Sequence, residues 1–328
     1  MNSKERVRAV IDSQAVDRIP VSTWSHDFLR EWSADDLADH TIERQLACEY
    51  DFVKLNPRWT MFAEPWGNEY ERPIEQKFPR LLKQVINSAD DIGNIAKVQT
   101  DHPVLQEYRK ALAKTVIGLE DEVDVLATLF SPLACLGLLC GGVGQPLISY
   151  TESNPEDVHA VLKDITQTLV EYSQELLTEG ASGLFYAPLQ WTSTDVCTPA
   201  FYAEFGEAYD LQVLAAVQSA PFNMMHVCGN NIALDRFYDY PVHVLNWDNF
   251  GAGNPSLQAA AEACDKVVSG GVPHRAVHKL TSKELRAEIE GALDGVGDRV
   301  MLTGGCALGA SIPLTVRQEI QALSSELS

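Results

Sequence analysis

Apolar residues gather in short runs along the chain, and after each run the apolar positions recur at intervals of three and four residues. A short run rich in β-branched and aromatic residues predicts a buried strand, whereas the longer spacing predicts an amphipathic helix. This alternation is typical of βα units and not of a β-sandwich. Eight segments fit the strand pattern: "IPVSTW" (19–24), "FVKLNP" (52–57), "DVLATLF" (124–130), "GLFYAP" (183–188), "FNMMHVC" (222–228), "VHVLNW" (242–247), "KVVSGGV" (266–272) and "RVMLTGG" (299–305).

Two of the intervening helices have clear signals at their ends. One is expected to begin with Asn154 as its N-cap, followed by Pro155 at the first helical position. The other is expected to begin with Thr281 and Glu284 in capping-box spacing. Both segments carry an apolar stripe that can pack on a sheet.

Eight alternating units favour a (β/α)8 barrel, an α/β fold, over a doubly wound sheet. No glycine-rich dinucleotide fingerprint follows the first predicted strand. Such barrels commonly exceed about 250 residues as one unit, so we expect residues 1–328 to form a single domain. The polar segment from about 67 to 122 is longer than a simple crossover, and we interpret it as an insertion that forms a small hairpin or excursion over the barrel mouth.

Composition and charge exclude some classes of function. Hydrophobic residues make up 45% of the chain, but Asp and Glu number 46 against 25 Lys and Arg, which gives a net charge of −21. This excess disfavours nucleic-acid binding, which needs a surface that neutralises phosphates. No run approaches the roughly 20 apolar residues of a membrane span, and the charged N-terminus is unlike a signal peptide. We therefore expect a cytoplasmic protein that binds neither nucleic acid nor membrane.

The fifth predicted strand ends in "HVC", and in a barrel the chemistry is expected on the loops that follow the strands. Alternate side chains of a strand share a face, so His226 and Cys228 can reach the same ion. Cys306 follows the eighth predicted strand, after Gly304 and Gly305, which permit close approach of the backbone. We interpret these three residues as zinc ligands. Taken alone, the His-x-Cys pair also fits a packed histidine beside a buried cysteine.

The type of ligand bears on the reaction. Three protein ligands leave a fourth position open, which is the mark of a catalytic zinc site. Two thiolates cancel the charge of the ion, so the site is a poorer Lewis acid than an all-histidine site that generates hydroxide. A thiol in the fourth position would lose its proton and become nucleophilic. The pattern therefore favours alkyl transfer to sulfur over hydrolysis.

Other polar and aromatic residues also lie near predicted strand ends. An acidic residue in such a loop is commonly only solvated, and a tryptophan there often packs in the core or at its rim. The candidates for a fourth ligand or a proton relay are Glu64, Asp195, Asp248 and His274. The candidates for substrate binding are Trp24, His26, Asn56, Arg58, Trp191, Asn246 and Trp247.

Over nearly its whole length the chain resembles the uroporphyrinogen decarboxylase superfamily, whose fold is a (β/α)8 barrel. The resemblance rests on "SKERVRAVIDSQAVDRIPV", "YDFVKLNP", "FSPLACLG", "HVCGNN" and the terminal "GGC". True decarboxylases carry an Arg-Gln-Ala-Gly-Arg segment after the first strand, where this chain has "STWSHDFLREW". Their Phe-Ser-Asp segment has no match either, because the chain reads "KLNPRWTMFAEPWG" at that place.

A second branch of the superfamily, the methylcobamide:thiol methyltransferases, carries a His-x-Cys…Cys zinc motif that His226, Cys228 and Cys306 match. The resemblance implies a zinc-dependent methyltransferase acting on a small-molecule thiol or methyl donor. It implies methylcobalamin as the corrinoid, either free or held on a partner corrinoid protein, because this chain has no Asp-x-His-x-x-Gly segment. Two arrangements fit the resemblance: the zinc serves either the acceptor thiol or the methyl donor. Metal-free porphyrinogen decarboxylation and a barrel that only binds its ligand remain the alternatives.

Overall fold

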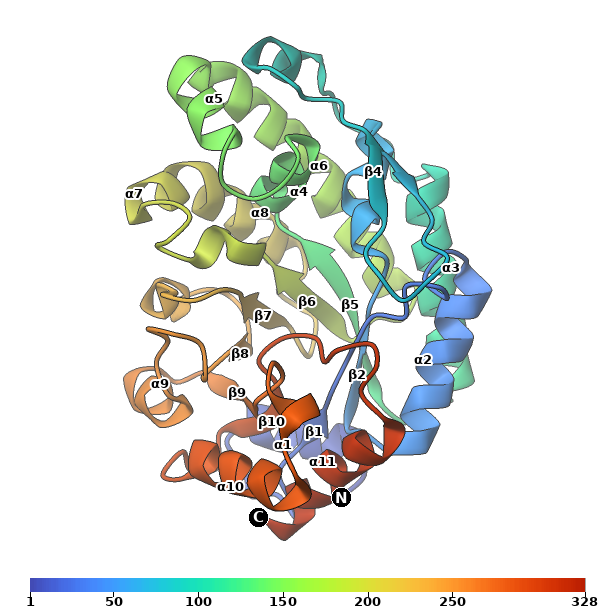
Figure 1. Ribbon diagram of the computed structural model, residues 1–328, viewed down its shortest axis with the longest axis vertical. Coiled ribbons are helices and arrows are strands. Elements are labelled where there is room, and N and C mark those ends of the chain that lie inside the picture. The colour runs from blue at the N-terminus through green and yellow to red at the C-terminus, as the bar shows by residue number, and fades with distance from the viewer. Residues whose placement is uncertain (328) are drawn as a thin grey trace.

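Eight parallel strands surround the centre of the molecule in the computed structural model, which describes residues 1–327 (Figure 1). Each strand lies within the range predicted for it from the sequence. The strands of this sheet are β1 (Val21–Ser22), β2 (Phe52–Leu55), β5 (Asp124–Phe130), β6 (Gly183–Ala187), β7 (Met224–Val227), β8 (Val244–Trp247), β9 (Val267–Val272) and β10 (Val300–Gly304).

The strands follow the order β1-β10-β9-β8-β7-β6-β5-β2, and the neighbouring strands are parallel. The two edge strands of this order also meet. Ser22 Oγ donates a hydrogen bond to the carbonyl oxygen of Phe52 at 2.7 Å. The backbone N–H of Asp51 donates to the carbonyl oxygen of Val21 at 2.9 Å. The sheet is therefore a nearly closed (β/α)8 barrel, as predicted, and the carboxyl ends of its strands share one mouth.

Helices surround the barrel, and the two termini lie at the same end of the molecule in Figure 1. No helix in the described part of the chain is long and apolar enough to cross a membrane. The helices are α1 (Ser3–Ile11), α2 (Ala34–Cys48), α3 (Pro103–Gly118), α4 (Pro132–Leu139), α5 (Leu147–Ser153), α6 (Pro155–Thr178), α7 (Pro199–Tyr202), α8 (Ala208–Ala216), α9 (Leu257–Ala263), α10 (Ser282–Leu293) and α11 (Leu314–Glu326).

The structure confirms one of the two predicted helix caps and corrects the other. Thr281 and Glu284 form the expected capping box at the start of α10. Asn154 precedes α6 as predicted, but its side chain makes no capping hydrogen bond. Asn154 also ends α5, where its backbone N–H donates to the carbonyl oxygen of Tyr150. Its backbone angles, φ −138° and ψ 56°, differ from the extended conformation that lets a side chain cap a helix.

The segment from 67 to 122 contains a hairpin, a short 3₁₀ turn and the helix α3. The hairpin pairs β3 (Glu69–Glu71) with β4 (Arg80–Lys83) in antiparallel fashion. In the loop between them, the Phe78 ring lies 4.9 Å from that of Phe28, which follows β1. The hairpin therefore reaches the loop at the barrel mouth, whereas α3 packs against α2 on the outside.

A buried carboxylate lies in the core beside β6. Asp210 of α8 is completely buried and accepts hydrogen bonds from the phenol groups of Tyr186 at 2.7 Å and Tyr202 at 2.5 Å. Among the residues that the structure describes, no cation forms an ion pair with it. Burial therefore raises the pKa of Asp210 from 3.8 to about 7, although the phenol hydrogen bonds oppose this effect.

This carboxylate makes the stability of the fold depend on pH. Because the folded pKa of Asp210 is the higher one, its contribution is fully present below about pH 4 and is lost as the pH rises through about 7. The difference between the two pKa values corresponds to about 4 kcal/mol. The free energy of unfolding, measured with urea at pH 5 and at pH 8, should differ less between the two pH values in Asp210→Asn than in the wild type. The control is Asp239→Asn, which changes an exposed aspartate and should keep the wild-type difference. An equal difference between the two pH values in all three proteins would contradict the prediction.

Candidate metal centre

His226, Cys228 and Cys306 come together at the mouth of the barrel. One ligand atom of each residue lies within 4.8 Å of the other two. His226 belongs to β7, Cys228 directly follows it, and Cys306 follows β10. Two strands, β8 and β9, separate β7 from β10 in the sheet, so the loop after β10 must turn across the mouth. In the described part of the chain, no other group of three His, Cys, Asp or Glu side chains has this geometry.

The ring of His226 is oriented by Asn246, which lies opposite it in the register of β7 and β8. The amide nitrogen of Asn246 donates to the carbonyl oxygens of Ser269 at 3.1 Å and Gly304 at 3.0 Å. Since these oxygens can only accept, the amide oxygen of Asn246 must face Nδ1 of His226, which lies 2.7 Å away. Nδ1 therefore carries the proton, and Nε2 keeps the lone pair that a metal ligand needs.

The two cysteines interact directly. A hydrogen bond between Cys228 and Cys306 holds the pKa of Cys306 well below its usual range, although burial opposes this. The same hydrogen bond, together with burial, raises the pKa of Cys228. Cys306 is therefore the more acidic thiol of the pair, and a thiolate is the form in which cysteine binds metals.

Three polar side chains, Asp248, His274 and Arg275, lie beside this cluster. The loop after β10 passes so close to Asp248 that a Cβ atom on Gly305 would lie 2.4 Å from the Asp248 Cα atom. The Asp248 carboxylate is buried, 2.9 Å from Nε of Arg275 and 3.8 Å from Nδ1 of His274. Asp248 and His274 therefore lie next to the cluster without belonging to it.

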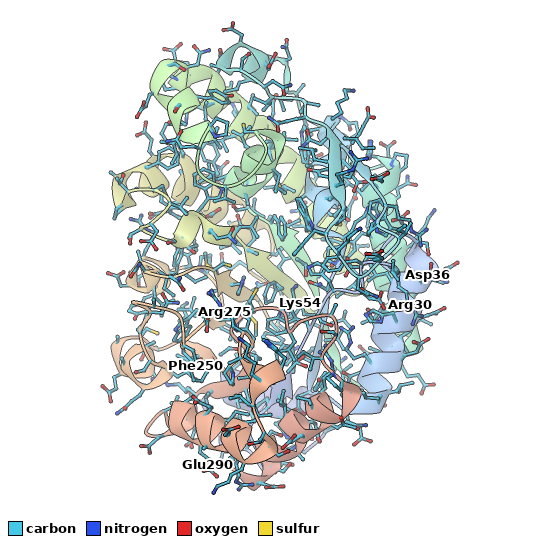
Figure 2. The ribbon with its side chains drawn as sticks, in the orientation of Figure 1. Arg30, Asp36, Lys54, Phe250, Arg275 and Glu290 are labelled. Atoms are coloured by element: carbon cyan, nitrogen blue, oxygen red, sulfur yellow. The ribbon has the colours of Figure 1, made fainter. Side chains whose placement is uncertain are left out.

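A half-buried lysine lies in the interior of the barrel near the same site. Lys54 of β2 is labelled close to the centre of the molecule in Figure 2. Its ammonium nitrogen lies 4.5 Å from the ring centroid of Phe185 and 5.6 Å from that of Trp24, and it donates a hydrogen bond to Asn56. Phe185 in turn stacks on His226, with ring centroids 5.3 Å apart. The aromatic ring thus connects the lysine to the cluster.

No carboxylate lies within ion-pair distance of Lys54 among the residues that the structure describes. Burial lowers the pKa of Lys54 to about 7, and the opposite charges of Cys306 and Glu31 limit the decrease. The Glu31 carboxylate already accepts hydrogen bonds from the His26 ring and from the backbone N–H of Asp27, both at 2.8 Å. Lys54 is therefore about half protonated near pH 7, and an anionic group in the barrel would favour its charged form.

A cavity of about 540 Å³ opens at the same mouth. Its volume is within the usual range for ligand sites, and most of its lining is apolar. It adjoins the cluster through the 3₁₀ turn Leu189–Thr192: Leu189 and Gln190 line the cavity, and Thr192 Oγ1 donates to the carbonyl oxygen of Cys228 at 2.7 Å. The lining residues include His26, Trp59, Phe78, Phe130, Leu138, Val143 and Val196.

Three other charged candidates are not part of the cluster. Glu64 is bound by Arg58, whose Nε lies 2.9 Å from its carboxylate, and by the hydroxyl of Thr60. Arg58 also pairs with Glu107, so it is not a free cation. Asp195 is exposed, and its carboxylate accepts hydrogen bonds from the amide of Asn231.

The aromatic candidates have different roles. Trp191 and Trp247 are completely or almost completely buried; the first stacks on Phe201, and the second donates to the carbonyl oxygen of Pro255. Both therefore pack in the core. Trp24, by contrast, lies beside Lys54, and His26 lines the large cavity.

Lys54 was missed as a site residue from the sequence, although a signal was present. A charged residue in the middle of an apolar parallel strand must face either the helices or the barrel interior. Asn56, which was a candidate, lies two residues later, and the two side chains are hydrogen-bonded. Alternate side chains of a strand lie on the same face, so the run "FVKLNP" already indicates that Lys54 and Asn56 face the same side of the sheet.

The three clustered residues fit a zinc ion. One nitrogen and two sulfur ligands are a common zinc donor set, and they leave a fourth position open. Tetrahedral zinc holds such atoms about 3.4–3.8 Å apart, so the side chains, already within 4.8 Å of one another, need only a small adjustment. The hydrogen bond from Nδ1 of His226 to Asn246 is the outer support that metal-binding histidines usually have.

Solved structures with a similar fold include methyltransferases and other enzymes. A methyltransferase from Methanosarcina mazei superposes with a TM-score of 0.85 at 17% identity, covering 99% of each chain. A B12-independent methionine synthase from Shewanella sp. W3-18-1 has a TM-score of 0.61 at 13% identity, covering 94% of this chain and 92% of that one. At these identities the likeness shows the fold alone.

No curated protein matches the sequence. The family model for uroporphyrinogen decarboxylase (URO-D), in contrast, matches residues 2–323, nearly the whole chain. The chain therefore belongs to the uroporphyrinogen decarboxylase family.

Proposed function

We propose that this protein is a zinc-dependent, corrinoid-linked methyltransferase whose zinc ligands are His226, Cys228 and Cys306. The observation that carries the proposal is the convergence of these three side chains at the barrel mouth, with His226 held by Asn246 so that Nε2 is free. The fold of the Methanosarcina mazei methyltransferase agrees with it. When bound there, zinc would keep a thiol of the substrate in its nucleophilic thiolate form.

The surrounding side chains then have definite tasks. Lys54 places a positive charge in the interior of the barrel, where it stabilises an anionic thiolate. Asp248, fixed by Arg275, stands beside the cluster and can accept the proton that a thiol loses on binding. The hairpin residue Phe78 and the loop residue His26 line the cavity and can contact a ligand there.

The methyl donor is proposed to be methylcobalamin, free or held on a partner corrinoid protein. The cavity of about 540 Å³ supports an organic ligand of considerable size at the mouth, because its lining is largely apolar. The reverse arrangement, in which zinc binds the methyl donor, uses the same residues. Assays in both directions separate the two arrangements.

Porphyrinogen decarboxylation has less support. A substrate with many carboxylates needs several free cations around the mouth, but Arg58 is paired with Glu64 and Glu107, and Arg275 with Asp248. Lys54 alone is left without an acidic partner near the cluster in the described part of the chain.

The test combines metal analysis with methyl transfer. We expect about one zinc per chain in the purified wild type and in the control Cys264→Ser, whose cysteine lies outside the cluster. Cys228→Ser and Cys306→Ser should lose most of the metal and with it methyl transfer from methylcobalamin to a panel of thiols. A wild type with almost no zinc would contradict the proposal. Zinc binding without any methyl transfer would indicate a barrel that only binds its ligand, and turnover of uroporphyrinogen would support decarboxylation.

A further inference from the structure

Two arginines, Arg44, which is half-buried, and Arg317, which is buried, lie close together beneath the loop that follows β1, and neither has an acidic ion-pair partner among the described residues. Arg44 belongs to α2, and Arg317 belongs to α11 and is only 4% exposed. Both donate to Ser25: Nη1 of Arg44 to its carbonyl oxygen at 3.1 Å, and Nη2 of Arg317 to its hydroxyl at 3.1 Å. Among the described residues, neither guanidinium forms an ion pair with a carboxylate. Buried cations in folded proteins are normally paired, so this arrangement is unusual.

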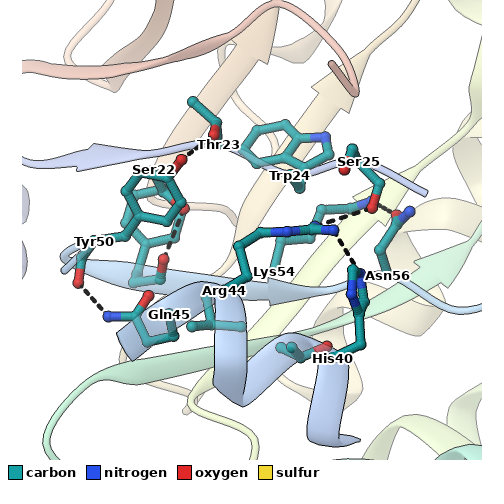
Figure 3. Close-up of a pocket in the computed structure, with 13 residues that line it drawn as sticks. Ser22, Thr23, Trp24, Ser25, His40, Arg44, Gln45, Tyr50, Lys54 and Asn56 are labelled. Atoms are coloured by element: carbon teal, nitrogen blue, oxygen red, sulfur yellow. Dashed lines mark hydrogen bonds between the residues drawn. The ribbon is translucent and has the colours of Figure 1, made fainter. Parts of the chain in front are cut away.

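The hydrogen bonds of the two groups are also incomplete. Figure 3 shows Arg44 reaching from α2 toward Ser25 and His40. Arg317 adds a long hydrogen bond, 3.4 Å, from Nη2 to the carbonyl oxygen of Gly309, and its guanidinium also interacts with the Tyr50 hydroxyl. Its Nη1 atom is buried and has no hydrogen-bond partner in the part of the chain that the structure describes. A buried donor left in this state destabilises the fold, and more so when it is charged.

Both arginines line a cavity of about 270 Å³ between α2 and the loop that leads into α11. We call it the arginine cavity, after Arg44 and Arg317. Burial and the neighbouring Arg317 lower the pKa of Arg44 to about 10, so both groups remain charged at neutral pH. Two like charges held next to an open space create a local positive potential in a chain whose net charge is −21.

The acidic residues of the arginine cavity offset this charge only in part, because Asp27 acts on Arg44 from a distance and neither Asp27 nor Glu43 forms an ion pair with the two arginines. Asp27 accepts hydrogen bonds from the side chain of Gln76 at 2.7 Å and from the backbone N–H of Leu29 at 3.2 Å. Glu43 is exposed, and Arg30 donates to both of its oxygens, at 2.6 and 3.1 Å. His40 is neutral at physiological pH, since burial lowers its pKa to about 4.

We propose that the arginine cavity is a binding site for a small oxyanion, a phosphate or carboxylate group, held by Arg44 and Arg317. Guanidinium groups match the geometry of such anions because their N–H donors lie in a planar fork. The anion would supply the acidic partner that the two cations lack and offset the repulsion between them. None of the proposed zinc ligands lines this cavity, so the anion site stands or fails independently of the methyltransferase proposal.

Binding of inorganic phosphate and of acetate to the purified protein tests the site. Calorimetric titration should give saturable binding of at least one of the two anions, and comparison of the two tells which class the site prefers. Arg317→Gln and Arg44→Gln should weaken the binding at least tenfold. The control Arg286→Gln, which changes an exposed arginine of α10, should bind like the wild type. Absence of saturable binding in the wild type, or equal affinity in all four proteins, would overturn the proposal.

A second variant keeps the test valid if loss of a buried arginine prevents folding. Ala47 lies one turn after Arg44 on α2 and also lines the cavity. Ala47→Glu would introduce a carboxylate next to the arginines, so this variant should unfold at a higher temperature and no longer bind the anion. An Ala47→Gln control should gain no stability. If Ala47→Glu unfolded at a lower temperature than Ala47→Gln, the claim that Arg44 and Arg317 lack an anionic partner would be contradicted.

Discussion

Replacing Lys54 with methionine is expected to weaken the binding of a thiol substrate at least about 30-fold, while the protein keeps its zinc. The reason is electrostatic. With two cysteine thiolates already present, a bound substrate thiolate makes the centre anionic. Lys54 lies near this centre, over the faces of Phe185 and Trp24, with no carboxylate in ion-pair distance among the described residues.

The size of the effect follows from the strength of a charge interaction in a partly desolvated site. Opposite unit charges about 4 Å apart interact by about 4 kcal/mol at an effective dielectric constant of 20, and the interaction decreases with distance. A loss of about 2 kcal/mol corresponds to roughly 30-fold in affinity. Methionine has a similar length and no charge, so it fills the same space between the two aromatic rings.

Steady-state kinetics with a range of thiol concentrations measure this prediction. KM should rise in Lys54→Met, and Lys54→Arg should recover part of the loss because it restores the charge. Lys266→Met is a matched control, since Lys266 is a half-buried lysine that donates to the carbonyl oxygen of Tyr240 away from the cluster. An unchanged KM in Lys54→Met would show that the lysine does not act on the thiol. Loss of zinc would assign Lys54 a structural role instead.

Replacing Asn246 with leucine is expected to lower zinc affinity about 10- to 100-fold, although Asn246 does not touch the metal. Changes at outer residues that orient a metal-binding histidine typically have this effect. In the wild type the amide oxygen fixes the proton on Nδ1 of His226, because the amide nitrogen is held by the carbonyl oxygens of Ser269 and Gly304. Leucine removes this constraint, so His226 can rotate or protonate Nε2.

Competition with a chromophoric zinc chelator gives the affinities directly. Asn246→Asp is the informative companion, because it keeps an oxygen acceptor for His226 and should bind zinc more tightly than Asn246→Leu. Thermal unfolding of the metal-free proteins shows whether each variant is folded before the titration. If Asn246→Leu bound zinc as tightly as the wild type, the orientation of His226 would not depend on Asn246.

The arrangement of strands and helices was predictable because it depends on local pattern. Apolar runs with intervening helical spacing gave all eight barrel strands, and "GGC" and "HVC" were placed at strand ends. In a barrel the carboxyl ends of all strands face one mouth, so residues distant in sequence are expected to meet there. The convergence of His226, Cys228 and Cys306 is consistent with that expectation.

The partners of the individual side chains were decided only by the tertiary structure. Glu64 follows a strand and looked like a candidate ligand, but it is bound by Arg58 six residues earlier in the chain. Trp191 and Trp247 lie close to strand ends, yet their side chains are packed in the core. Such outcomes depend on the path of the loops and on which neighbour fills each space, and neither is encoded in a periodic pattern.

The sequence by itself determined the barrel, its mouth and the residue types of the candidate zinc site. The periods of strands and helices are local properties, and residues at the carboxyl ends of barrel strands can be recognised from the same local pattern. The tertiary structure decided which nitrogen of His226 is free, that Lys54 faces the interior, and that Arg44 and Arg317 meet beneath one loop. These features require strand register and contacts between residues as far apart as α2 and α11, which only the folded chain brings together.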